Sequence, residues 1–139
     1  MNDLKNAKIL LILAKDDLRA MGGMLDDEVF SDAIFGFHAQ QAVEKGIKAW
    51  LSNCGVYYPK THDIDQLLAL MEEKGMDMVD SGYWSQLNPF AVQFRYSLME
   101  MDEPLLPRDA IIQQVGILLA KVESELHKAS DSEEFQGPV

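Results

Sequence analysis

Four side chains that can hold an anion share one face of the segment FHAQQAVEKGIKAWL, residues 37–51. Successive residues of an α-helix are rotated by about 100°, so residues spaced by three and four lie on one side of it. The residues with this spacing are His38, Gln41, Lys45 and Lys48. An imidazole, an amide and two ammonium groups together can bind a phosphate or a carboxylate.

The same helical face begins with apolar residues. Phe30, Ile34 and Phe37 continue into the polar set with helical spacing, so we expect this side of the helix to face the core. A half-buried lysine is unfavourable unless a carboxylate or a bound anion compensates its charge. The face is therefore either a groove that receives an anion or a network of side chains that bond to one another.

Two pairs of polar residues on this helix are spaced for direct contact. Gln41 and Lys45 are four residues apart, and so are Glu44 and Lys48, which makes the members of each pair neighbours. On a solvent-facing turn, such a pair contributes only about 0.2–0.5 kcal/mol. Their spacing alone does not distinguish a solvated face from a pocket.

A second candidate cluster lies in NPFAVQFRYS, residues 88–97. Arg95 follows Phe94 of an apolar stripe, so we place it at the boundary between core and solvent. Its guanidinium can bind a carboxylate such as Glu44 in a structural role, or a phosphate in a functional one. Tyr96 can stack on a base or pack against the protein. With two residues of the segment VYYPKTHD, the candidate ligand-binding set is His38, Gln41, Lys45, Lys48, Lys60, His62, Arg95 and Tyr96.

Several catalytic and metal-binding patterns are absent from the sequence. The three histidines and the one cysteine, at positions 38, 54, 62 and 127, do not have the spacing of zinc ligands. There is no glycine-rich phosphate loop, no Gly-x-Ser-x-Gly elbow and no Glu-x-x-His pair for a di-iron bundle. Cys54, near a helix end, is interpreted as a small apolar side chain. We therefore predict no metal, no cofactor and no catalytic residue.

The composition indicates one acidic domain. The chain has 139 residues, typical of a single domain that spans residues 1–139, and a formal net charge of −11. This charge opposes non-specific binding to nucleic acid or to an anionic membrane. Cys54 has no cysteine partner, and the longest apolar run, ILLILA, is too short to span a membrane. We expect a cytoplasmic protein without a membrane segment.

Apolar residues spaced by three and four predict helices and no sheet. The first helix covers residues 3–21, and the second starts near residues 26–28 or at Ser31 and ends near residue 53. A third begins at Thr61 as N-cap, and a stripe over residues 84–98 is kinked or restarted at Asn88-Pro89. The last helix starts at Pro107 and ends near Ala129, before a frayed tail, residues 130–139. The predicted fold is all-α, an antiparallel up-and-down bundle of four to five helices.

Three segments carry a resemblance to a known family: FHAQQAVEKGIKAWL, YPKTHDIDQLL and FRYS. In this order, in an all-helical chain of this size, they resemble the higher eukaryote and prokaryote nucleotide-binding (HEPN) domain. The likeness extends over residues 4–128 and is strongest at residues 41–45 and 61–63. The resemblance implies a helical bundle, frequently a homodimer, that stands alone or beside a minimal nucleotidyltransferase.

The family that the chain resembles includes ribonuclease toxins and non-catalytic nucleotide-binding domains. Its ribonucleases carry an arginine followed, after four to six intervening residues, by a histidine. Arg95 matches the arginine, but the permitted histidine positions hold Glu100, Met101 and Asp102. Histidine transfers protons near neutral pH, whereas a carboxylate at these positions would repel the phosphate. We therefore predict no ribonuclease activity of the usual family kind.

Three hypotheses for the function follow. The leading one is a non-catalytic HEPN-like domain that binds a nucleotide or other phosphate ligand, or docks a minimal nucleotidyltransferase. The second is a divergent, toxin-like ribonuclease that uses Arg95 with His38 or His62. The third is a purely structural dimerisation module whose polar side chains bond to one another. A homodimer is expected from the resemblance and from apolar residues such as Leu105 and Leu106.

Overall fold

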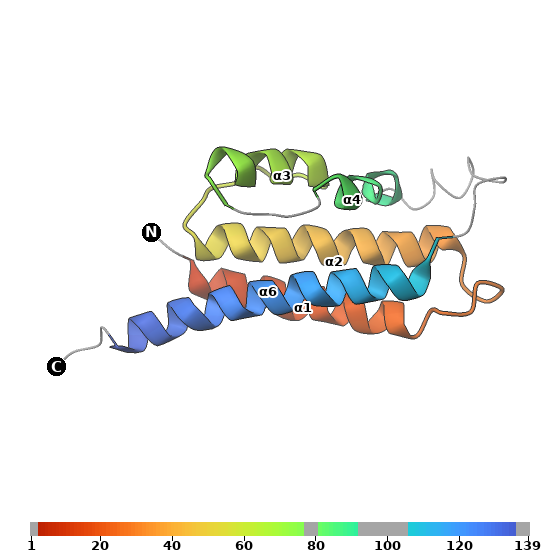
Figure 1. The fold of residues 1–139 in the computed structure, drawn as a ribbon, viewed down its shortest axis with the longest axis horizontal. Helices are drawn as coiled ribbons and strands as arrows, with labels where there is room; N and C mark the ends of the chain where they lie inside the picture. The colour runs from red at the N-terminus through yellow and green to blue at the C-terminus, as the bar shows by residue number, and fades with distance from the viewer. Residues whose placement is uncertain (1–2, 77–80, 92–105, 136–139) are drawn as a thin grey trace.

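The computed structural model describes residues 3–76, 81–91 and 106–135, and every regular element in these ranges is a helix. The long helices are α1 (Leu4–Gly22), α2 (Asp32–Asn53) and α6 (Arg108–Phe135), which pack along one another (Figure 1). The shorter elements are α3 (Ile64–Glu73), α4 (Ser81–Ser85) and the 3-10 helix η1 (Asn88–Ala91). The predicted all-α bundle is confirmed.

Helix α2 is the central element of the bundle. Helix α1 runs opposite to both α2 and α6, and α3 and α4 lie on the side of α2 that faces away from α1 (Figure 1). Helix α2 contacts α1, α6, α3 and η1. Helix α2 therefore has neighbours on most of its circumference, and its buried apolar residues lie on several of its sides.

The core face of α2 differs from the one predicted. Its fully buried apolar side chains are those of Phe35, Ala39, Ala42, Val43, Ile47, Ala49 and Leu51. Phe30, Ile34 and Phe37 are only half-buried, so the expectation that their stripe faces the core is wrong. That stripe lies at a boundary between core and solvent because the neighbouring helices cover other sides of α2.

Two glycines allow other elements to approach α2 closely. A Cβ atom on Gly46 would lie 2.6 Å from Cδ2 of Leu119 in α6. A Cβ atom on Gly36 would lie 2.3 Å from Cδ1 of Phe90 in η1. Carbon atoms do not approach so closely in a packed interior, so any larger residue would push these elements apart.

The helix starts are fixed by short polar side chains. Ser31 is the N-cap of α2, with its hydroxyl oxygen 3.3 Å from an α2 backbone N–H, which settles the start of this helix. The prediction that Thr61 caps α3 is wrong, since Asp63 is the N-cap. The Asp63 carboxylate accepts two α3 backbone N–H groups, whereas the Thr61 hydroxyl accepts only the N–H of Asp63 itself.

The predicted break at Asn88-Pro89 coincides with the start of η1, which follows α4 after Gln86 and Leu87. Trp84 and Leu87 are buried, as their stripe predicts. The Asn88 carboxamide oxygen accepts the backbone N–H of Ile64 at 2.8 Å, so the break also stabilises the start of α3. Ala91, the next member of the predicted stripe, is half-buried, and Phe94 and Leu98 lie outside the described residues.

Helix α6 buries the predicted residues: Ile111, Val115, Leu118, Val122 and Leu126. It begins at Arg108, next to the predicted Pro107, and extends to Phe135. The predicted end near Ala129 is therefore wrong, and residues 130–135 continue the helix. Leu106, predicted to be exposed, is half-buried against the core, whereas Leu105 lies outside the described residues.

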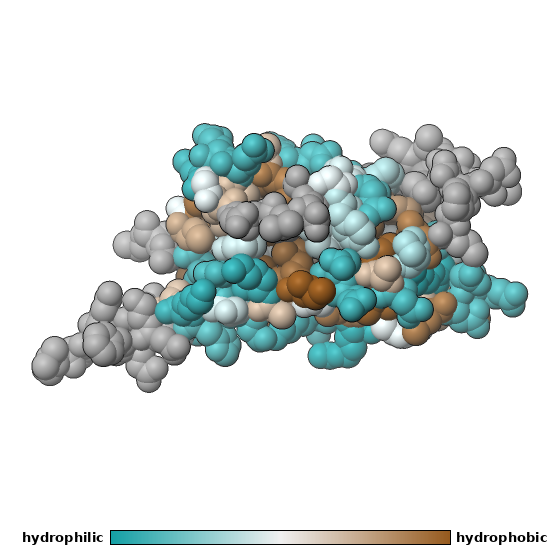
Figure 2. Space-filling model, viewed as in Figure 1, coloured by the Kyte–Doolittle hydropathy of each residue, from teal (hydrophilic) through white to brown (hydrophobic). Residues whose placement is uncertain are grey.

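One face of the molecule is mainly hydrophilic and carries a small apolar area (Figure 2). Figure 2 shows polar side chains over much of one face and an apolar area over the middle of α6. In the described ranges, no helix is long and apolar enough to cross a membrane.

Candidate functional site

The first polar cluster joins α1 to α2 through Asp17. Nζ of Lys45 donates a hydrogen bond to Oδ2 of Asp17 at 2.7 Å, and Nδ1 of His38 lies 3.0 Å from Oδ1. The Asp17 side chain is 13% exposed and that of Lys45 is 25% exposed, so both groups are largely withdrawn from water. The Asp17 carboxylate thus compensates the charge of Lys45, as a half-buried ammonium requires.

The second polar cluster surrounds Glu44, whose side chain is only 4% exposed. Nζ of Lys48 donates to Oε2 of Glu44 at 3.0 Å, and Nε2 of Gln40 donates to Oε1 at 3.1 Å. Nδ1 of His62 lies 3.0 Å from the same Oε1 atom. Both carboxylate oxygens therefore have partners, and this buried charge is satisfied within the protein.

The Glu44 cluster also holds the connection between α2 and α3. Nε2 of Gln40 donates to the backbone carbonyl of His62 at 2.7 Å. Nζ of Lys48 donates to the carbonyl of Thr61 at 2.8 Å and lies 5.8 Å from the ring centroid of Tyr58. These contacts hold Tyr58, Thr61 and His62 against α2, so the cluster performs a structural task.

The predicted site residues are thus only partly brought together. His38 and Lys45 share Asp17, and Lys48 and His62 share Glu44. Gln41 donates to Oε1 of Gln40 at 2.7 Å and thereby adjoins the second cluster. Lys60 belongs to neither cluster. Arg95 and Tyr96 lie outside the described residues.

Asp17 and Gln40 were missed by the sequence reasoning. Asp17 follows the buried Ala14 by three residues, so a carboxylate at the edge of the inward stripe of α1 was a visible signal. Gln40 is fully buried, and its position on α2 next to Gln41 gave no sign of which amide would face inward.

Arg108 is a third missed residue, and it organises the opposite end of the bundle. Its guanidinium donates to the backbone carbonyls of Met24 and Phe30, both at 2.6 Å, and to Oδ1 of Asp32 at 2.9 Å. The residue is 6% exposed and lies over the ring of Phe35. It connects the start of α6 to the segment between α1 and α2.

A surface groove of about 500 Å³ lies where the start of α1 meets the segment after α2. It is lined by Asp3, Asn6, Ser52, Gly55, Val56, Tyr57, Tyr58 and Lys60. Nδ2 of Asn6 donates to Oγ of Ser52 at 2.9 Å across its floor. The side chain of Tyr57 is freely accessible, since this residue is 89% exposed.

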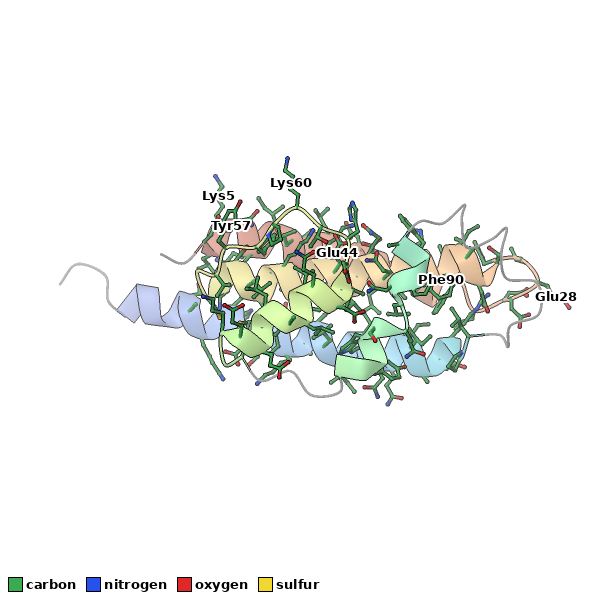
Figure 3. All side chains as sticks on the ribbon, turned by 90° about the horizontal axis from the view of Figure 1, so that it is seen from above. Lys5, Glu28, Glu44, Tyr57, Lys60 and Phe90 are labelled. Carbon is green, nitrogen blue, oxygen red and sulfur yellow. The ribbon has the colours of Figure 1, made fainter. Side chains whose placement is uncertain are left out.

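Lys60 is the cation of this groove, and its ammonium group is available. Among the described residues, no carboxylate pairs with it and no hydrogen bond engages its Nζ. Figure 3 shows the Lys60 side chain projecting away from the bundle, on the same edge as Tyr57, while Glu44 lies within the bundle. Lys45 and Lys48 differ from Lys60 because each already has a carboxylate partner.

The described residues give little support for a nucleophilic Cys54 or for a metal site. Burial and the nearby Glu125 carboxylate raise the pKa of the Cys54 thiol, which disfavours the reactive thiolate. Within the ranges that the structure describes, no three His, Cys, Asp or Glu side chains are grouped as metal ligands.

Comparison with known proteins identifies the family of this helical chain. No curated protein and no solved structure gives a match to it. Residues 7–130 match the family described as the HEPN domain. The match covers all but the start of α1, all of α2, α3, α4 and η1, and all but the end of α6. The match includes both polar clusters and most of the groove. The chain therefore belongs to the HEPN domain family.

Proposed function

We propose that this HEPN domain is a non-catalytic module that binds a nucleotide or another phosphate ligand in the groove beside Tyr57 and Lys60. The observation that carries the proposal is the accessible, unpaired ammonium of Lys60 next to an exposed aromatic ring. A phosphate would bind Lys60, and a base would stack on Tyr57.

The face of α2 is a weaker candidate for the same ligand. A phosphate at Lys45 or Lys48 would have to displace Asp17 or Glu44, or bind beside that negative charge. Removing a carboxylate from a buried, hydrogen-bonded pair costs several kcal/mol, roughly 3–5. Asp3 also lines the groove, but no carboxylate has to leave Lys60 there, so the groove is the more favourable anion site among the described residues.

The net charge of −11 makes this a local interaction. Long-range attraction of an anion is unfavourable, so binding depends on short-range contacts with the ring, the ammonium and the polar floor. We therefore expect modest affinity that decreases with salt, and preference for a base-bearing phosphate over free phosphate.

The proposal is tested by titrating the protein with ATP, GTP, inorganic triphosphate and a short RNA in a calorimeter. Tyr57→Ala should raise the dissociation constant of the nucleotides about fivefold or more, because base–aromatic stacking contributes about 1–3 kcal/mol. Lys60→Ala should weaken all phosphate ligands and reduce the dependence of binding on salt.

The matched control is Lys74→Ala, which removes one positive charge from an exposed residue at the end of α3. It should leave binding unchanged. If Lys74→Ala weakens binding as much as Lys60→Ala, the effect is general electrostatics and the groove is refuted. If folded Lys45→Ala loses binding while Lys60→Ala retains it, the ligand occupies the α2 face instead.

The prediction that the protein does not cleave RNA is tested by incubating it with total RNA, with and without a chelator. Uncleaved RNA is the expected result, because the permitted positions after Arg95 hold no histidine. Cleavage that is lost in His38→Ala or His62→Ala would establish the divergent ribonuclease instead. Docking of a minimal nucleotidyltransferase stays a prediction from the family resemblance.

A further inference from the structure

A cavity of about 330 Å³ lies between α1 and α6, and it shares no lining residue with the groove beside Tyr57 and Lys60. The two helices lie antiparallel along one another (Figure 1). Leu11 and Leu126, which are 7% and 2% exposed, form an apolar floor, and Ile12, which is 60% exposed, forms an apolar wall. An apolar ligand group would be stabilised here by leaving water.

An ion pair marks one end of the cavity. Nζ of Lys15 on α1 donates a hydrogen bond to Oε2 of Glu123 on α6. Each of these charges already has a partner of opposite sign within the protein. This end of the cavity therefore does not need a charged ligand group.

The other end of the cavity carries hydrogen-bond donors. Lys8 precedes Lys15 by seven residues on α1, and Ser130 follows Glu123 by seven residues on α6. Because the helices are antiparallel, Lys8 and Ser130 lie together at this end, with His127 one turn nearer the middle. Among the side chains that the structure describes, none forms an ion pair with Lys8 or a hydrogen bond with His127 or Ser130. An ammonium, an imidazole and a hydroxyl group are thus available to a carboxylate.

The α1 side of the cavity is positively charged, although the chain as a whole is acidic. Residues 4–15 contain three lysines and no acidic residue. On α6, the neighbouring Glu125 is already paired with Lys121 at 3.3 Å and with Lys128 at 3.5 Å. The charge around the cavity therefore favours a ligand with an anionic group and disfavours one with a cationic group.

The distance between the two ends limits the length of the ligand. Seven residues of helix, from Lys8 to Lys15, extend over about 10 Å. An extended chain advances about 1.2 Å per bond, so this length accommodates about eight carbon atoms. The cavity volume lies at the small end of the range for small-molecule sites, roughly 300–1,000 Å³, which agrees with a ligand of this size.

We propose that this cavity binds a medium-chain fatty acid, a free carboxylate with a straight chain of about eight carbons. The carboxylate binds the Lys8 ammonium, with Ser130 as a second donor. The chain lies on Leu11 and Leu126 and against Ile12, and its methyl end points toward the ion pair at the other end. One charged end and one apolar body in the ligand thus match one positive end and one apolar floor in the cavity.

Titration with sodium octanoate, followed by the methyl NMR signals of the protein, tests the site. Octanoate should shift the signals of Leu11, Ile12 and Leu126 with a dissociation constant of about 0.1–1 mM. Hexanoate should bind about tenfold more weakly, because each buried CH₂ group contributes roughly a factor of four. Dodecanoate should bind no more tightly than octanoate, because its additional carbons extend beyond the cavity.

The uncharged 1-octanol tests the contribution of the carboxylate. It keeps the chain length and should bind about fivefold more weakly than octanoate. Three results would overturn the proposal: equal binding of octanol and octanoate, affinity that increases further up to dodecanoate, or shifts at Tyr57 and Lys60 in place of those at the cavity.

Charge reversal of Lys8 tests the position of the carboxylate. Lys8→Glu should weaken octanoate binding about fivefold or more, because it places a negative charge next to that of the ligand. The matched control is Lys5→Glu, an exposed lysine of α1 that does not line the cavity and projects away from α6 (Figure 3). Equal weakening by the two variants would mean that octanoate follows the general charge of α1, and the site would be refuted.

A second pair of variants tests the apolar wall. Ile12→Ser should weaken octanoate binding about fivefold, whereas Ile9→Ser should leave it unchanged, since Ile9 is 49% exposed but does not line the cavity. Circular dichroism should show unchanged helix content in both variants, because both positions are exposed. Binding that is insensitive to Ile12→Ser would contradict the proposed placement of the chain.

Discussion

Glu44 shows at the residue scale why polar side chains occur on a central helix. A carboxylate that is 4% exposed is stable only if hydrogen-bonded groups surround it, and Lys48, Gln40 and His62 supply these groups. The sequence reveals the contact with Lys48, which is four residues away on the same helix. The contact with His62 depends on how the connection between α2 and α3 folds back, which residue spacing does not specify.

Replacing Glu44 with Gln tests the importance of this charge. Glu44→Gln keeps the size of the side chain but leaves the Lys48 ammonium, whose side chain is 13% exposed, without its anion. We expect the free energy of unfolding to fall by about 3 kcal/mol, measured by urea titration. Glu73→Gln, at an exposed position of α3, should change it by less than about 0.5 kcal/mol. Equal changes in the free energy of unfolding for Glu44→Gln and Glu73→Gln would show that the Glu44 cluster does not stabilise the fold.

Glu123 gives the protein a residue-specific dependence on pH. A hydrogen bond from Lys15 lowers the pKa of the Glu123 carboxyl, and the charge of Lys15 acts in the same direction. A carboxyl with a lowered pKa in the folded state stabilises the fold above its unfolded pKa and loses this effect as pH falls through the folded value.

The stability of wild type should therefore decrease more than that of Glu123→Gln between about pH 5 and pH 3. Urea midpoints at pH 7, 5 and 3 measure the difference. The effect should be small, because both side chains are 41% exposed to screening water. Identical pH profiles of the two proteins would exclude a stabilising role of this pair.

At the scale of elements, the helices on the outside of the bundle were the most predictable. The inward residues of α3 and α6 follow helical spacing because each of these helices packs on one side only. Helix α2 violates this simple pattern because it has neighbours around most of its circumference. Its polar face could be found from the sequence, and Asp17 could be placed at the edge of the inward stripe of α1. The pairing of Asp17 with Lys45 could not be predicted, since the two residues are 28 positions apart on different helices.

Gly36 offers a direct test of how closely η1 approaches α2, and Gly116 in α6 is its control. Gly36→Ala should lower the free energy of unfolding by about 1–3 kcal/mol, because its Cβ would overlap Phe90, 2.3 Å away. Gly116→Ala should raise it by about 0.5–1 kcal/mol, because nothing lies within 4 Å and alanine favours the helix. Thermal or urea unfolding measures whether each variant is less or more stable than the wild type. A stabilising Gly36→Ala would mean that η1 can move away from α2 without cost.

At the scale of the whole molecule, buried charges hold α2 at its start, through Asp32, and near its middle, through Glu44. The Glu44 cluster anchors the connection to α3, and Arg108 anchors the segment between α1 and α2. One continuous apolar core extends over α1, α2, α3, α4 and α6. The single domain predicted from length is therefore expected to unfold as one unit. In other proteins a layer on the surface can unfold before the rest, and the layer in that position here is formed by α3 and α4.

The two tryptophans can determine whether this layer is part of the cooperative unit. Trp50 lies in α2 and is 6% exposed, while Trp84 lies in α4 and is 4% exposed, so each reports on its own layer. In Trp50→Phe the fluorescence of Trp84 remains, and in Trp84→Phe that of Trp50 remains. Because both rings belong to one core, the fluorescence midpoint should coincide with the circular dichroism midpoint within each variant. A Trp84 signal that changes at lower urea than the helical signal would show that the α3–α4 layer separates from the three long helices first.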